Sequence, residues 1–204
     1  MENATYYYYA EILHPKTFIV NGVELLPFSL GHWMILERMG SPFLSGNIPV
    51  DISFGDGIAS FFELLLVCGQ TYEDNIAMLD NPQIFKETIK SFENHMKKVM
   101  KKDKHWHIQK EVANIKEYLS YFIKMPSFTD KANSKTVPSG IDWKSNLLSI
   151  LKNEYHYTES EALNCSVKKC FYLWCIAAEK QGSIQVSNKW EVEQLKQIGV
   201  KGID

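Results

Sequence analysis

Two histidines flank a tryptophan at His105-Trp106-His107, the segment whose residue types come nearest to a metal site. Imidazoles two residues apart face the same side only in a strand, whereas a helical metal site needs ligands four residues apart. This segment is expected at a junction between two helices, with no cysteine or carboxylate at ligand spacing beside it. His32 and Glu37 are five residues apart, so they also lack the four-residue spacing of a helical metal site. We therefore expect no metal site and interpret His32 as a structural histidine.

The chain has four cysteines, which offer thiol chemistry only where a thiol meets a second thiol or a base. Cys165, Cys170 and Cys175 recur at five-residue intervals. Because this interval is about 500° of helical turn, neighbours in the series are not expected to share a helix face. The N-terminus lacks a basic region followed by an apolar one, so no secretion signal is expected. All four cysteines, including Cys68, are thus predicted to be reduced and buried.

The sequence also lacks the common loops that carry phosphates or activated nucleophiles. The short motifs "GDG" and "GVKG" have neither a preceding strand nor the Lys-Ser/Thr ending of a phosphate-binding loop. No Gly-x-Ser-x-Gly elbow is present. We therefore expect no catalytic residue, no cofactor and no enzymatic activity.

Lysines cluster between positions 97 and 104, next to a tryptophan. Two pairs of them, 97 with 101 and 98 with 102, are four residues apart, a spacing at which like charges destabilise a helix by about 0.2–0.5 kcal/mol per pair. A negatively charged partner would remove this cost. The alternatives are an acidic protein surface, a nucleic acid, or a lysine face that is merely solvated. The residues that form this candidate partner-binding site are Lys97, Lys98, Lys101, Lys102 and Trp106.

Charge is distributed unevenly, although the formal net charge is only −2. Residues 1–85 carry ten acidic side chains against two basic ones, whereas residues 86–124 carry ten lysines against five acids. This separation suits contact within the chain, self-association or contact with an external partner. Arg38 is the only arginine, and the scarcity of this residue argues against a dedicated nucleic-acid reader.

The sequence predicts a β-hairpin followed by helices. Asn21-Gly22 between apolar residues is typical of a two-residue turn. Ser29 is expected to cap a first helix that ends at Gly40, and Thr71 to cap a later one. The expected elements are strands 17–20 and 23–26 and helices 30–39, 57–68 and about 72–78.

A long helical tract runs from Pro82 to Met125 and carries two apolar stripes that are out of phase. A break near "KKDKHWH" is therefore expected, giving a lysine-rich antiparallel helical hairpin. Residues 126–140 are polar, bounded by prolines, and are expected to be a linker. Beyond them, residues 141–204 predict a helical module with a capping box at Thr158-Glu159-Ser160-Glu161 and a last helix capped by Ser187. The predicted fold is mainly α: a multi-helix domain over residues 1–125 with a small N-terminal β-hairpin, then a three- to four-helix C-terminal module.

Two segments carry a family resemblance. "LLPFSLGHWMILERMGSPFL", Leu25–Leu44, resembles the Pro-x-Ser-Leu-Gly-His helix opening of small tail-morphogenesis proteins of bacterial viruses. "DWKSNLLSILKNEYHYTESEALNCSVKKCFYLWCIAAEKQG" is similar to a Trp-led three-helix unit of phage tail-assembly proteins, with Glu161-Ala162-Leu163 at its middle turn.

This resemblance implies a non-enzymatic, protein-binding morphogenesis protein, either a tail assembly chaperone or a minor structural component. Its partners would be other proteins, such as phage tail components or further copies of itself. The expected location is the cytoplasm, that of the host for a viral protein, or the virion, with no association with a membrane. The alternative is a nucleic-acid-binding regulator that uses the lysine patch at 97–104.

Overall fold

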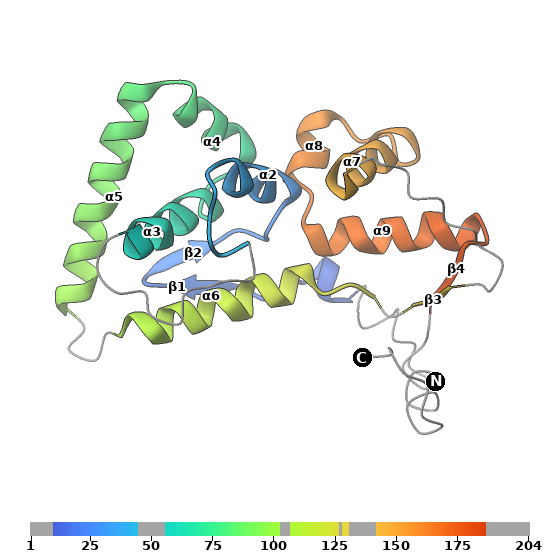
Figure 1. The fold of residues 1–204 in the computed structure, drawn as a ribbon, viewed down its shortest axis with the longest axis horizontal. Coiled ribbons are helices and arrows are strands. Elements are labelled where there is room, and N and C mark those ends of the chain that lie inside the picture. The colour runs from blue at the N-terminus through green and yellow to red at the C-terminus, as the bar shows by residue number, and fades with distance from the viewer. Residues whose placement is uncertain (1–9, 45–55, 103–106, 127, 131–141, 187–204) are drawn as a thin grey trace. The chain divides into compact units, whose positions relative to one another are not determined.

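The computed structural model describes residues 10–44, 56–102, 107–126, 128–130 and 142–186. In this part the chain is mainly helical, with a β-hairpin near the N-terminus, a set of helices after it and a three-helix C-terminal module (Figure 1). The predicted fold class is therefore confirmed. The chain divides into two compact units, residues 17–122 and residues 1–16 together with 123–204.

The hairpin of the first unit forms at the predicted Asn-Gly turn. Strand β1 (Phe18–Val20) pairs antiparallel with β2 (Val23–Leu25). Asn21 and Gly22 have φ angles of 49° and 78°, the left-handed values that a two-residue turn of this kind requires. The backbone N–H of Asn21 donates a 2.8 Å hydrogen bond to Oε2 of Glu111, so the turn is attached to a distant helix.

Three helices follow the hairpin, and two of them begin at predicted caps. The Ser29 hydroxyl accepts from the N–H three residues on, at the start of α2, and the Thr71 hydroxyl does the same for α4. The intervening helix is apolar along most of its length, and most of its C-terminal half is buried, as expected for a core helix. The three helices are α2 (Leu30–Arg38), α3 (Asp56–Cys68) and α4 (Tyr72–Leu79).

The lysine-rich tract forms two helices, α5 (Pro82–Lys102) and α6 (Ile108–Ile123). They do not pack along each other as the predicted antiparallel hairpin requires. Figure 1 shows the two helices running in different directions, and α5 packs on α3 and α4 instead of along α6. The physical reason is the β-hairpin, whose turn residue Asn21 lies between them. Its backbone bonds to α6, and its side-chain amide lies 2.8 Å from the sulfur of Met96 on α5. The expected break falls at residues 103–106, outside the described residues.

An aromatic cluster forms the centre of this unit. Phe18 of β1 and Phe28 before α2 both contact the ring of Tyr118 on α6, with centroids 5.4 and 5.9 Å apart and edge-on geometry. The Tyr118 hydroxyl donates a 2.7 Å hydrogen bond to the carbonyl of Leu26. Because this tyrosine is fully buried, the bond satisfies a polar group that would otherwise destabilise the core.

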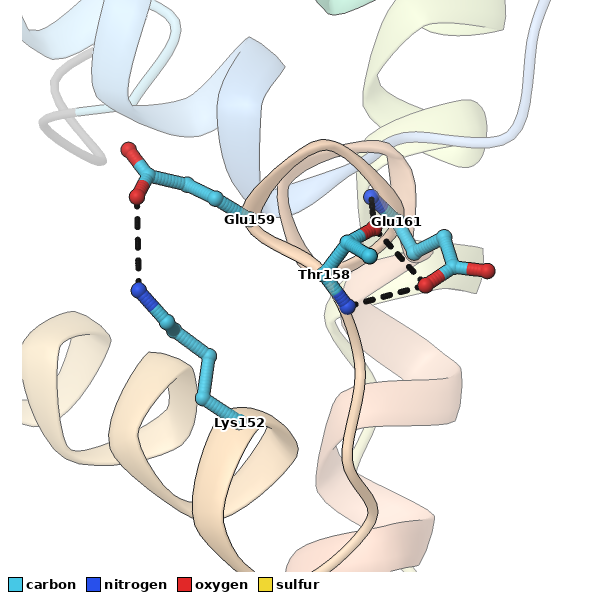
Figure 2. Close-up of polar contacts among 4 residues, drawn as sticks. All are labelled: Lys152, Thr158, Glu159 and Glu161. Carbon is cyan, nitrogen blue, oxygen red and sulfur yellow. Dashed lines mark hydrogen bonds and ion pairs between the residues drawn. The ribbon is translucent and has the colours of Figure 1, made fainter.

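The second unit contains α7 (Trp143–Asn153), α8 (Glu159–Asn164) and α9 (Val167–Lys180). The predicted capping box opens α8: Thr158 N–H donates to Oε2 of Glu161 at 2.8 Å, and the Glu161 N–H donates to the Thr158 hydroxyl at 3.2 Å. Figure 2 shows both bonds, together with the ion pair between Lys152 and Glu159 that joins α7 to α8.

A small sheet in this unit lies where the sequence predicted no strand. β3 (Phe128–Asp130) pairs antiparallel with β4 (Ile184–Val186). β3 falls inside the segment 126–140 that we interpreted as a linker, whose residues 127 and 131–140 lie outside the described residues. Strands of three residues are too short to give a recognisable period, and tertiary packing forms this pair instead: Phe128 packs edge-on against Trp174, with ring centroids 5.5 Å apart. The helix expected after Ser187 also lies outside the described residues.

Residues 10–16 belong to the second unit and not, as expected, with the rest of 1–125. Residues 10–13 are helical, and Glu11 forms an ion pair with Lys168 near the start of α9. The Lys168 side chain is only 2% exposed, whereas that of Glu11 is half exposed. A buried ammonium group needs an anion close by, so this pair holds the N-terminal segment to the unit.

Candidate protein-binding surface on helix α5

Helix α5 positions the four candidate lysines near its C-terminal end. It begins after Asn81, whose side-chain oxygen accepts from the N–H groups of Gln83 and Ile84 at 3.1 and 3.2 Å. Pro82 takes the first helical position, where its missing N–H leaves no gap in the helical hydrogen bonds. The other end carries Lys101 and Lys102 in its last turn, where positive charge interacts favourably with the helix dipole.

The lysines occupy one side of this helix and the apolar residues the other. At about 100° per residue, positions 97, 98, 101 and 102 span about 140° of the helix circumference. The apolar stripe is centred on the opposite side, and its member Met96 is fully buried. The stripe consists of Phe85, Ile89, Phe92, Met96 and Val99.

The four lysine side chains are all exposed. Lys97 makes a 3.6 Å ion pair with Glu93 one turn earlier, and at 62% and 44% exposure this pair adds little stability. Within the described residues, no ion pair or hydrogen bond reaches Lys98, Lys101 or Lys102. These three lysines therefore have no counter-charge in the part of the chain that the structure describes. The fifth predicted site residue, Trp106, lies outside the described residues, as does Lys104.

An apolar pocket of about 120 Å³ lies between α5 and α3, on the apolar side of α5. Phe62 and Phe92 meet edge-on at its wall, with ring centroids 6.3 Å apart. The sequence interpretation missed this pocket, because a periodic stripe does not show how completely its neighbours will cover it. Its lining consists of Ala59, Phe62, Glu63, Leu66, Ile89, Phe92 and Glu93.

Glu63 is the sequence feature that indicates this pocket once the structure is known. It is the only charged residue in the apolar run from Ile58 to Cys68. Its carboxyl group lines the pocket, and burial raises its pKa. No hydrogen bond or ion pair reaches it from any residue that the structure describes. The lining of the pocket thus includes two glutamates, Glu63 and Glu93, while the opposite side of α5 carries the lysines.

His32 has the structural role that the sequence predicted. Its Nδ1 accepts from the backbone N–H of Ser29 at 3.2 Å, and its Nε2 lies 2.7 Å from the carbonyl oxygen of Gln70. Only an imidazole that carries its proton on Nε2 and none on Nδ1 satisfies both contacts, so the ring is neutral. Burial lowers its pKa to about 4, although the Gln70 carbonyl acts in the opposite direction. His32 therefore joins the start of α2 to the loop between α3 and α4.

All four cysteines are buried and free, as predicted. Burial raises the pKa of Cys68 to about 12. The sulfur of Cys170 lies 3.7 Å from the backbone carbonyl oxygen of Cys165. Cys165 precedes the N-cap Ser166 of α9, whereas Cys170 and Cys175 lie within that helix.

Within the described ranges, no three histidine, cysteine or carboxylate side chains come together as a set of metal ligands. His107 is exposed at the start of α6, and its neighbour His105 lies outside those ranges. Among the described helices, none has both the length and the apolar character needed to span a membrane. The chain matches no family model, no curated protein and no solved structure.

Proposed function

We propose that this protein is a non-enzymatic protein-binding factor that contacts an acidic surface of its partner through the lysine face of α5, defined as Lys97, Lys98, Lys101 and Lys102. The observation that carries the proposal is the arrangement of these side chains: they are exposed, adjacent, and, for three of the four, without a counter-charge among the described residues. Like charges at this spacing repel, and an acidic partner relieves that repulsion.

The proposal extends to assembly of a bacteriophage tail, where the factor acts as a tail assembly chaperone or as a minor structural component. This narrower assignment rests on the resemblance of Leu25–Leu44 and of the three-helix module to tail-morphogenesis proteins. A tail component or another copy of the chain is then the partner, and the host cytoplasm or the virion is the location.

A matched pair of variants tests the protein-binding role. Lys98→Gln/Lys102→Gln removes two lysines of the face without disturbing the Lys97–Glu93 pair. Lys110→Gln/Lys116→Gln removes the same charge from exposed positions on α6. Loss of the first pair relieves one like-charge repulsion but removes Lys102 from the last turn of α5, so the thermal unfolding of both variants is compared with that of the wild type.

The assay is recovery of partner proteins from nuclease-treated extract of the native or infected cell. We expect the wild type and the α6 variant to recover the same protein, and the α5 variant to recover at least five-fold less. Equal recovery by all three chains would refute the proposal.

A nucleic-acid-binding regulator is the second candidate, because exposed lysines also attract phosphates. It predicts a gel shift of a short DNA or RNA at low salt, weakening steeply as salt rises. Each phosphate contact contributes a slope of about −0.9 in a plot of log affinity against log salt for duplex DNA. A shift that Lys98→Gln/Lys102→Gln abolishes, with no protein recovered, would favour this candidate.

A further inference from the structure

The pocket of about 120 Å³ between α3 and α5 is formed by one face of each helix. On both helices its lining residues recur at intervals of three and four positions, the spacing of side chains that share a helix face. Most of its walls are apolar side chains. The exposed Ala59 and the partly exposed Phe62 and Phe92 leave it open to solvent. The pocket is therefore a surface site that another molecule can enter.

The volume of the pocket limits the size of its ligand. Sites for cofactors and drug-sized molecules measure about 300–1,000 Å³, whereas a cavity of about 150 Å³ holds a molecule as small as benzene. At about 120 Å³, this pocket has room for a single amino-acid side chain and not for a cofactor. Its size therefore fits the anchoring residue of a partner protein.

The charge of the lining determines which side chain fits. Glu63 has no hydrogen bond or ion pair with any residue that the structure describes, and burial raises its pKa. Glu93 also lines the pocket, and its carboxylate lies 3.6 Å from the Lys97 ammonium group. An apolar occupant would remove water from the Glu63 carboxylate without supplying a counter-charge, which is unfavourable. A cationic side chain supplies that charge.

We propose that this pocket binds an arginine side chain of a partner protein, with the guanidinium group at Glu63 and the alkyl stem against Phe62 and Phe92. A guanidinium group presents a planar fork of donors that matches a carboxylate, and it stacks on aromatic rings. Because it is more weakly hydrated than the ammonium group of lysine, it enters an apolar site more readily. The identity of the occupant as a protein side chain rests on the protein-binding role proposed above, whereas the lysine face takes no part in the site.

Methyl NMR of the purified full-length chain tests the pocket directly. The probes are the tripeptides acetyl-Ala-Arg-Ala-amide and acetyl-Ala-citrulline-Ala-amide, because citrulline has the shape of arginine without its charge. We expect the arginine peptide to shift the methyl signals of Leu66 and Ile89 in a saturable titration. The citrulline peptide should bind about five-fold more weakly, the factor that a partly exposed charge pair contributes. Equal affinity for the two peptides, or no shift of these signals by the arginine peptide, would overturn the proposal.

Glu63→Gln and Glu24→Gln form a matched pair of variants. The first keeps the size of the side chain and removes its charge, and the second removes the same charge from an exposed position on β2. Glu63→Gln should bind the arginine peptide as weakly as the wild type binds the citrulline peptide, whereas Glu24→Gln should bind it as the wild type does. Unchanged affinity in Glu63→Gln would overturn the proposal. Because the two peptides are compared on the wild-type chain, a variant that fails to fold leaves the proposal open to refutation.

A failed titration and a failed extract assay have different meanings, because the titration uses no partner and does not involve the lysines. A failed titration, together with partner recovery that depends on Lys98 and Lys102, refutes the arginine site alone. A successful titration, together with equal recovery by the three chains of the extract assay, refutes the lysine face alone.

Discussion

Lowering the pH from 7 to 5 is expected to destabilise the unit of residues 17–122 through His32. In the folded state burial holds the pKa of this imidazole at about 4, whereas the ordinary value is 6.5. Between these two values the unfolded chain binds a proton that the folded chain does not. The contribution of His32 to the free energy of unfolding is therefore fully present above pH 6.5 and is lost as the pH falls toward 4.

The size of the effect follows from the same two pKa values. Their difference corresponds to about 3 kcal/mol once the pH is below both. Because the change from pH 7 to pH 5 covers only part of that interval, the expected loss from this residue is about 2 kcal/mol. That is a large share of the stability of a domain of this size, which is about 5–15 kcal/mol.

Comparison with His32→Gln isolates this contribution from those of the carboxyl groups. A glutamine at this position of a capping box can accept from the Ser29 N–H and has no proton to gain in this pH range. We expect the variant to lose about 2 kcal/mol less than the wild type between pH 7 and pH 5. His95→Gln, an exposed histidine on α5, is the matched control and should behave as the wild type does.

The assay is urea unfolding at each pH, followed by the methyl NMR signals of the buried residues Ile35 and Leu36, which report on this unit. If His32→Gln and the wild type lose equal stability, the assignment of His32 as a neutral buried imidazole is wrong. An imidazole signal of His32 that titrates near pH 6.5 would be equally decisive against it.

Three further substitutions test the local structure. Gly22→Ala places a side chain at a φ of 78°, where space is available but a residue other than glycine strains the backbone. The substitution should lower the free energy of urea unfolding of residues 17–122 by about 1 kcal/mol. Thr158→Ala removes the cap of α8 and should lower the free energy of unfolding, measured by thermal unfolding, by about 1 kcal/mol. An unchanged stability would show that the cap does not stabilise this helix. Glu11→Gln removes the carboxylate beside the buried Lys168 and should lower the free energy of unfolding by about 2 kcal/mol. Amide hydrogen exchange over residues 10–13 should become faster, and unchanged exchange there would contradict the role of this ion pair.

Local signals predict the elements of this fold because their physics is contained within a few residues. The Asn21-Gly22 turn depends on two left-handed φ angles, and the caps at Ser29 and Thr158 depend on a hydroxyl and an N–H three residues apart. The register of the hairpin follows from its turn, and helix α3 was evident from its apolar run.

Long-range contacts are what the sequence does not reveal. The stripe on α5 predicts an apolar face but not its neighbours, and the β-hairpin keeps α6 from packing along it. Glu11 and Lys168 are 157 positions apart, and nothing in their local sequence indicates that they meet.

The lysine face of α5 is the central feature of this account, and site-directed photo-crosslinking in the native or infected cell tests it most directly. A benzophenone amino acid replaces Lys98 on the face in one chain and Lys116 on α6 in a second, both exposed positions. We predict a nuclease-resistant, protease-sensitive adduct with another protein from position 98, and none from position 116. An absence of any adduct at 98, equal adducts at both positions, or an adduct that nuclease removes would contradict it.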